Sequence, residues 1–276
     1  MNLVVQSPGA QAAQAAELAR LSGARAVEQL AEGAFRLRGA SDNAALRERC
    51  RELQLDCAFV PEGRRFADLK LVAMDMDSTL ITIECIDELG DLAGKKDEIS
   101  AITASAMRGD IAYPESLRRR VALLEGLHVD DLERVYRERL RLSPGAQALL
   151  AACRKHGVKL LLVSGGFTFF TDRLKSRLGF DYTLSNRLEM DGDRLTGRVL
   201  GDIVDAGAKA ARFREVAHAL GAAREHTVAI GDGANDLKML AEAGLSVAYR
   251  AKPVVKAKAD CALDFAGLDG VMHLFE

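Results

Sequence analysis

The first 69 residues alternate short apolar runs with two stretches of helical spacing. Ser41 stands where an N-cap is expected for the second helix, and a polar connection follows at 61–68. The order βαββαβ predicts a small ferredoxin-like domain over residues 1–69. The expected strands lie at 3–6, 25–29, 34–37 and 57–60, and the expected helices at 10–21 and 43–53.

From residue 70 onward, buried apolar runs alternate with helical spacing. Such alternation predicts an α/β fold with a doubly wound parallel, Rossmann-like sheet. The stretch at about 86–142 has helical spacing and little strand character, so we expect a helical cap inserted after the first strand of a domain that covers 70–276. The expected strands are 71–74, 158–163, 182–190, 194–199, 227–230, 245–248 and 261–263, with helices at 145–156, 167–178, 208–220 and 237–243.

Composition and charge limit the kinds of partner. The chain has 276 residues, 49% of them hydrophobic and 28% charged, which is typical of a soluble globular protein. Its net charge of −2 creates no basic field for nucleic acid or an anionic membrane, and no run approaches the roughly 20 apolar residues that span a bilayer. We expect neither nucleic acid nor membrane as a partner, so an anionic small-molecule substrate must be held by local charges.

The cysteines and the N-terminus favour a cytoplasmic protein. Five cysteines, an odd number, lie mostly in apolar segments without a Cys-x-x-Cys pair, which indicates buried thiols in a reducing compartment. The N-terminus lacks the basic and long apolar regions of a secretory signal.

Three stretches with reactive side chains follow apolar runs of the second part. Asp75 and Asp77 come directly after the first strand, 164–166 (Ser-Gly-Gly) follows the second, and 231–236 follows a later one. The ends of parallel strands meet at one edge of a sheet, where ligands bind. Each stretch alone is most often an ordinary turn, but their combination makes that interpretation weak. Two neighbouring carboxylates are costly unless a metal ion or a proton compensates them, so the pattern indicates metal-assisted phosphoryl transfer.

This ordered set of motifs resembles the haloacid dehalogenase superfamily over about residues 70–265. The stretch 75–79 (Asp-Met-Asp-Ser-Thr) matches its first motif, Ser164 its second, Lys209 its third and 231–236 its fourth. The resemblance implies a magnesium-dependent phosphatase, preceded here by a small domain similar to the ACT-like regulatory domain of some members.

The chemistry of phosphate-ester hydrolysis gives these residues expected roles. Asp75 is the expected nucleophile, which forms an aspartyl-phosphate. Asp77 is expected to protonate the leaving oxygen and then to activate water, and it favours a phosphatase because related ATPases carry Thr there. The resemblance alone promotes Lys209, which should neutralise the phosphoryl group. Ser164 and the backbone N–H of Gly165 should bind the phosphate oxygens.

Magnesium is the expected cofactor, because it prefers carboxylate and phosphate oxygens and keeps several waters. Asp75 and Asp232 should bind it through their side chains and Asp77 through its backbone carbonyl. The resemblance places Asp236 close to the metal in water-mediated or indirect contact. It gives Asn235 the role of holding a ligand or the lysine of the third motif.

The narrower motifs imply O-phospho-L-serine as substrate, hydrolysed in the last step of serine biosynthesis. Glu84 would then bind the ammonium group, and Arg120, chosen by its register within the run 118–120, would bind the carboxylate. Met107 and Tyr113 would shield the site from water when the cap closes.

Two other functions stay open on the sequence alone. A phosphotransferase that passes the phosphoryl group from Asp75 to homoserine or another small alcohol would share every residue named above. A ligand-sensing protein with a vestigial site is disfavoured, because the acids and the lysine of the motifs are all present. The N-terminal domain is open to a regulatory or binding role, a structural role or a dimerising role, and the last would make the protein a homodimer.

Overall fold

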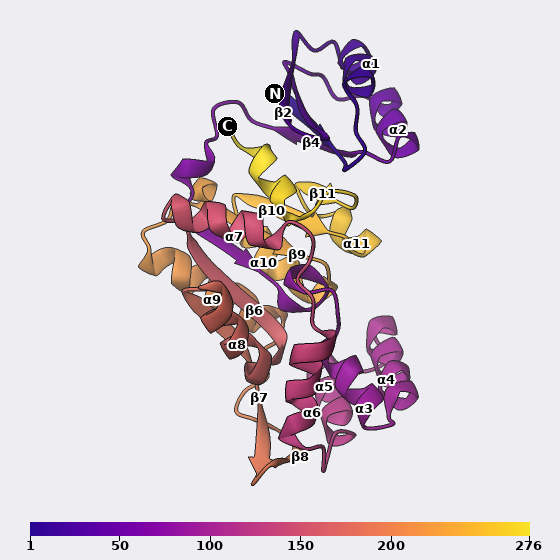
Figure 1. Cartoon of the computed structure of the whole chain (residues 1–276), viewed down its shortest axis with the longest axis vertical. Helices are drawn as coiled ribbons and strands as arrows, with labels where there is room; N and C mark the ends of the chain where they lie inside the picture. The colour runs from indigo at the N-terminus through magenta and orange to yellow at the C-terminus, as the bar shows by residue number, and fades with distance from the viewer.

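The computed structural model describes residues 1–276 and contains two β-sheets (Figure 1). The first is antiparallel, with strand order β2-β3-β1-β4, and it carries both of its helices on one face. The expected βαββαβ order is confirmed. Its elements are β1 (Asn2–Gln6), α1 (Ala12–Ser22), β2 (Ala26–Ala31), β3 (Ala34–Arg38), α2 (Ala44–Glu52) and β4 (Asp56–Val60).

The second sheet has seven strands in the order β11-β10-β9-β5-β6-β7-β8, all parallel except the β7–β8 hairpin. This confirms the expected doubly wound sheet. The strand that follows residue 70, β5, lies at its centre, between β9 and β6. The strands are β5 (Leu71–Met74), β6 (Lys159–Phe167), β7 (Tyr182–Asp191), β8 (Arg194–Leu200), β9 (Thr227–Gly231), β10 (Leu245–Tyr249) and β11 (Cys261–Leu263).

Strand β5 is buried on both faces because its alternate side chains point into two different cores. Its second and fourth residues pack with α7 and α8, and its first and third pack with α9 and α10.

None of the helices is both long enough and apolar enough to cross a lipid bilayer. The helices of this part are α7 (Ala146–Lys155), α8 (Thr168–Leu178), α9 (Ala206–Ala219), α10 (Leu237–Glu242) and α11 (Pro253–Lys256).

The helical stretch after β5 forms the expected cap, at the opposite end of the molecule from the N-terminal sheet (Figure 1). Its outgoing and returning connections pair at a hinge, where the N–H of Thr82 donates to the carbonyl of Arg141 at 3.0 Å. The cap also contacts the hairpin, because the N–H of Gly126 donates to the carbonyl of Leu195 at 2.8 Å. The cap helices are α3 (Cys85–Leu92), α4 (Lys96–Arg108), α5 (Tyr113–Ala122) and α6 (Val129–Arg134).

The N-terminal sheet is docked on the last segment of the chain. The carboxylate of Asp56, in β4, accepts the backbone N–H groups of 264–266. Arg36, in β3, donates to the carbonyls of His273 and Phe275. These contacts lie far from the cap, and no residue of 1–69 lines the cavity described below.

Two local expectations are wrong. The N-cap of α2 is Asn43 rather than Ser41, because Asn43 directly precedes the helix and its side chain accepts the N–H of Leu46 at 2.9 Å. Strand β6 does not end at residue 163 but runs to Phe167, because it resumes its pairing with β7 after a bulge.

Candidate active site

The strand order β9-β5-β6 brings the three motif stretches to one edge of the second sheet, facing the cap. A cavity of about 490 Å³ lies there. Three of the expected residues, Ser164, Lys209 and Asp236, are fully buried next to residues that line it. The others line the cavity itself: Asp75, Asp77, Glu84, Met107, Tyr113, Arg120, Gly165, Asp232 and Asn235.

Asp75, Lys209 and Asp236 form a buried chain of charges. Nζ of Lys209 lies 2.9 Å from Oδ1 of Asp75 and 2.8 Å from Oδ1 of Asp236. Burial alone would lower the pKa of Lys209, but the charges of Asp236 and Asp75 outweigh it and raise that pKa, so the lysine is protonated. Oδ1 of Asp75 also accepts the N–H of Met76 at 2.7 Å. Both contacts of this carboxylate use Oδ1, so Oδ2 of Asp75 is free to bind a ligand or to act as a nucleophile.

The carboxylates around this lysine carry more negative charge than it can neutralise. Asp75, Asp232 and Asp236 each offer an oxygen within 4.8 Å of the others. Both oxygens of Asp236 already have partners. Its Oδ1 contacts Lys209, and its Oδ2 accepts the N–H groups of Asp232 at 3.2 Å and Gly233 at 3.0 Å. Burial, followed by the charge of Asp236, raises the pKa of Asp232 to about 7. A divalent cation with oxygen ligands fits this site, and Asp75 and Asp232 are the carboxylates with an oxygen free to bind it.

Asp77 lies in the irregular turn Met76–Leu80 that follows β5. Its Oδ1 accepts the N–H of Cys85 at 2.9 Å, and its Oδ2 lies 3.4 Å from Oγ of Ser164. Burial, followed by the charge of Glu84, raises the pKa of Asp77 to about 7. A carboxyl group with that pKa can both give and take a proton near neutral pH, as a general acid and base must.

The stretch 164–166 bulges out of the sheet. Val163 pairs with Leu184, and Phe167 pairs with Asn186, so three residues of β6 face a single residue of β7. Two residues of the bulge, Gly165 and Gly166, line the cavity.

Close approach explains why two glycines occupy this bulge. A Cβ atom on Gly166 would lie 2.8 Å from Oδ2 of Asp77, and one on Gly165 would lie 2.3 Å from the hydroxyl of Tyr113. The N–H of Gly166 donates to Oγ of Ser164 at 2.8 Å. The bulge therefore contacts the first motif on one side and the cap on the other.

The charged residues expected to recognise a substrate lie on the cap side of the cavity. Glu84 accepts the hydroxyl hydrogen of Ser78 at 2.6 Å. Among the three consecutive arginines of α5, only Arg120 lines the cavity, whereas Arg118 and Arg119 are exposed. The carboxylate of Glu84 and the guanidinium group of Arg120 thus face the same cavity as the motif residues.

The two residues expected to shield the site differ in their placement. The hydroxyl of Tyr113 donates to the carbonyl of Gly165 at 3.2 Å, which joins the cap to the bulge at 164–166. Met107 is 62% exposed and lies at the rim, with its sulfur 3.9 Å from Nζ of Lys252. Of the two side chains, Tyr113 is partly buried against the sheet and Met107 is exposed.

Sequence reasoning did not assign a role to three polar residues at the site. Thr79 donates its hydroxyl to Oδ1 of Asp232 at 3.2 Å. Lys252 lines the cavity; its position just after β10, at the same edge of the sheet, is the signal that could have found it. Asn186 is buried beside the bulge, and an Asn in the middle of a strand pattern is its signal.

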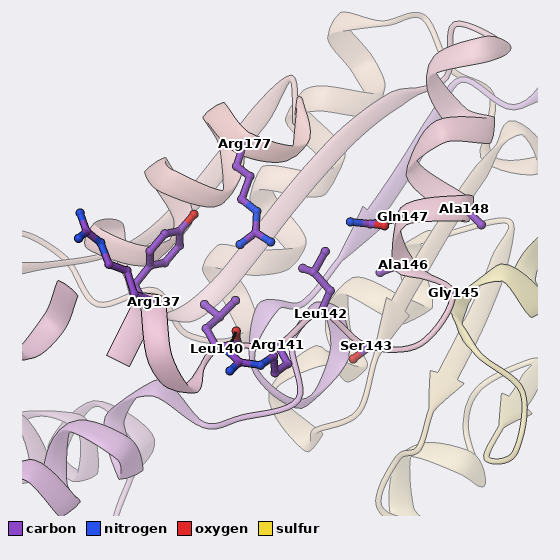
Figure 2. A pocket seen from close by; sticks show the side chains of 11 residues that line it. Arg137, Leu140, Arg141, Leu142, Ser143, Gly145, Ala146, Gln147, Ala148 and Arg177 are labelled. Carbon is purple, nitrogen blue, oxygen red and sulfur yellow. Dashed lines mark hydrogen bonds between the residues drawn. The ribbon is translucent and has the colours of Figure 1, made fainter. Parts of the chain in front are cut away.

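A second and larger hollow, of about 920 Å³, lies beside the hinge and contains none of the expected residues. It is lined by 140–143, the start of α7 and Arg177 of α8. Figure 2 shows Arg177 and Gln147 pointing into it. Its lining has no carboxylate, imidazole or thiol, so it offers neither the expected nucleophile nor a set of metal ligands.

The chain is similar to several known proteins that are named phosphoserine phosphatases. A phosphoserine phosphatase from Polaromonas sp. is 54% identical over 215 residues, which are 76% of this chain and 91% of that protein. The crystal structure of a probable phosphoserine phosphatase from Vibrio cholerae has a TM-score of 0.87 and 38% identity, and the match covers 99% of this chain and 85% of that one. A substrate-bound phosphoserine phosphatase has a TM-score of 0.71 and 36% identity over 75% of this chain and 99% of its own.

Two family models match the chain. One, described as a domain of unknown function, matches residues 3–49. The other, described as haloacid dehalogenase-like hydrolase, matches residues 72–241, which is more than half of the chain. The chain belongs to the haloacid dehalogenase-like hydrolase family.

Proposed function

We propose that the protein hydrolyses O-phospho-L-serine to L-serine and phosphate, with Mg²⁺ as cofactor and an aspartyl-phosphate on Asp75 as intermediate. The observation that carries this proposal is the buried contact of Asp75 with Lys209, which leaves one carboxylate oxygen free at the cavity. The names of the relatives support the substrate, because relatives with 43–54% identity are phosphoserine phosphatases.

In the first step, Oδ2 of Asp75 attacks the phosphorus atom, and the bond from phosphorus to the serine oxygen breaks. Asp77 gives its proton to that leaving oxygen, so that serine departs as an alcohol. The ammonium group of Lys209 keeps Asp75 oriented and offsets the negative charge that gathers around the phosphoryl group.

In the second step, Asp77 is a carboxylate and takes a proton from a water molecule. The oxygen of that water attacks phosphorus, the bond to Asp75 breaks, and phosphate leaves. Both aspartates return to their starting states. The same group serves as acid and then as base, which a pKa of about 7 allows.

The metal would be held by the side chains of Asp75 and Asp232 and by the backbone carbonyl of Asp77, with Asp236 in indirect contact. When bound, Mg²⁺ supplies positive charge beside the carboxylates and the phosphate.

Binding of the metal should be visible in stability as a function of pH. In the metal-free protein Asp232 has a pKa of about 7, above its ordinary value of 3.8. Between these values the folded state holds a proton that the unfolded state has lost, so the contribution of Asp232 to the unfolding free energy falls as pH rises from about 4 to 7. Mg²⁺ removes this penalty, and we expect it to raise Tm by about 5 °C at pH 8 and by little at pH 5.

Calorimetric melting with and without Mg²⁺ at the two pH values measures this effect. Asp232→Asn should lose most of the gain at pH 8. An equal gain at both pH values, or none at either, would contradict a metal bound by Asp232.

Substrate recognition is proposed to involve Glu84 for the ammonium group and Arg120 for the carboxylate. Arg120→Ala should raise KM for O-phospho-L-serine about ten- to hundredfold, because hydrogen bonds to a charged group are lost. KM for O-phosphoethanolamine, which lacks the carboxylate, should change little. Arg118→Ala is the matched control, since Arg118 is on the same helix but exposed. Equal effects on both substrates would remove Arg120 from carboxylate recognition.

A direct assay tests the proposal as a whole. The purified protein with Mg²⁺ should release free phosphate from O-phospho-L-serine, and the rate should not depend on added homoserine. Release of no phosphate would refute the proposed hydrolysis. Formation of phosphohomoserine in place of phosphate would identify a phosphotransferase instead.

We also propose that residues 1–69 and 70–276 are two domains, and that the enzyme acts in the cytoplasm in the last step of serine biosynthesis. The separate sheets, which lie within 2–60 and 71–263, support this division.

A further inference from the structure

The carbonyl oxygen of Gly165 receives hydrogen bonds from two different parts of the chain. Nδ2 of Asn186, in β7 of the sheet, donates to it at 2.8 Å. The hydroxyl of Tyr113, the first residue of α5 in the cap, donates to it at 3.2 Å. The core thus holds this oxygen with one donor, and the cap supplies the second donor only when it lies against the core.

Asn186 is a rigid support for this carbonyl. Its side chain is buried, with only 1% of the residue exposed, and both ends of its amide are bonded. Its Oδ1 accepts the N–H of Val204 at 2.8 Å, just before the helix that carries Lys209. A buried amide with both ends satisfied is held in a single orientation.

A chain of contacts leads from the hydroxyl of Tyr113 to Asp77, which is the proposed acid and base of the reaction. The carbonyl of Gly165 shares a peptide plane with the N–H of Gly166, and that N–H donates to Oγ of Ser164 at 2.8 Å. The hydroxyl of Ser164 in turn lies 3.4 Å from Oδ2 of Asp77. Hydrogen bonds in such a chain polarise and orient one another.

The hydroxyl of Tyr113 fits beside residue 165 only because that residue is glycine. A Cβ atom on Gly165 would lie 2.3 Å from that hydroxyl oxygen, but 3.3 Å from the ring carbon that bears it. Burial raises the pKa of Tyr113 to about 12, so the hydroxyl keeps its proton and remains a donor at neutral pH.

We propose that Tyr113 is a positioning residue whose hydroxyl latches the closed cap to the carbonyl of Gly165 and thereby orients the peptide that holds Ser164 beside Asp77. This inference deepens the proposed phosphatase reaction and rests on it. It separates two roles of one side chain: the ring excludes water, and the hydroxyl couples closure of the cap to the order of the phosphate-binding bulge.

Tyr113→Phe tests the latch by removing one oxygen atom and keeping the ring. We expect KM for O-phospho-L-serine to rise about three- to tenfold, as for the loss of one net hydrogen bond, while Tm stays within about 2 °C of the wild type. An unchanged KM would overturn the proposal, and so would a large fall in Tm, because the hydroxyl would then be a structural group.

Gly165→Ala gives a second test, in which a steric clash rather than a missing hydrogen bond disturbs the contact. Alone, the added methyl group meets the hydroxyl of Tyr113, and kcat/KM should fall more than tenfold because the cap cannot close. In the double variant with Tyr113→Phe the oxygen at 2.3 Å is gone and the nearest ring carbon lies 3.3 Å from the added methyl group, so kcat/KM should rise above that of Gly165→Ala. Losses that simply multiply, with no rescue, would overturn the latch.

Hydrogen–deuterium exchange makes the test independent of the substrate. In the protein without ligand, Tyr113→Phe should speed exchange of the amides of α4 and α5, because the cap opens more often. Unchanged exchange would contradict the latch. Faster exchange in a protein that fails to hydrolyse O-phospho-L-serine would retain the latch and refute only the proposed reaction.

Discussion

Asp75→Asn should abolish turnover of O-phospho-L-serine and leave the protein folded. An amide is a far weaker nucleophile than a carboxylate and cannot form the aspartyl-phosphate, so we expect kcat to fall by about 10³-fold or more. The fold should persist because Lys209 keeps Asp236 at 2.8 Å, and because one carboxylate is removed from a site with an excess of them.

Three measurements check this result. Steady-state assays give kcat, thermal unfolding should give a Tm at or above that of the wild type, and acid quenching with radiolabelled substrate should trap label on the wild type alone. Asp172→Asn is the matched control, because Asp172 is an exposed aspartate on α8, outside the site. Substantial turnover by Asp75→Asn, or label trapped on it, would show that another group is the nucleophile.

The sequence predicted those parts of the fold that depend on local pattern. Residues 71–74 read as a buried strand because every one of them is apolar, and the strand has these bounds in the structure. The helical cap was predictable because its long stretch repeats apolar positions at helical spacing. The choice of Asn43 over Ser41 as N-cap was not, since either side chain suits that role and only the first helical residue decides between them.

The parts of the site that the sequence missed depend on contacts between distant segments. In the sequence Asn186 is only a polar residue within a strand, whereas in the structure its amide forms hydrogen bonds with both Gly165 and Val204. Lys209 follows the spacing of an ordinary helix, and resemblance to a family, rather than its own pattern, singled it out. Its complete burial between two carboxylates is the physical reason that it stands apart from the exposed lysines.

Lys209→Met should both destabilise the folded protein and abolish its activity. Methionine keeps much of the length of the side chain but not the charge, so Asp75 and Asp236 would remain buried without their cation. Breaking a buried ion pair on one side costs about 3–5 kcal/mol, which corresponds to a fall in Tm of about 10 °C. The loss of kcat/KM should exceed about a hundredfold, because the charge beside the reacting carboxylate is gone.

Charge balance supplies the decisive second variant. Adding Asp236→Asn to Lys209→Met removes one of the two orphaned carboxylates, so the double variant should regain much of the lost Tm while activity stays low. Lys175→Met, at an exposed position of α8, is the control and should match the wild type in both measurements. A single variant as stable as the wild type, or a double variant no more stable than the single one, would mean that Lys209 does not balance these carboxylates. Recovery of activity together with stability would mean that the lysine serves the fold and leaves the chemistry to other groups.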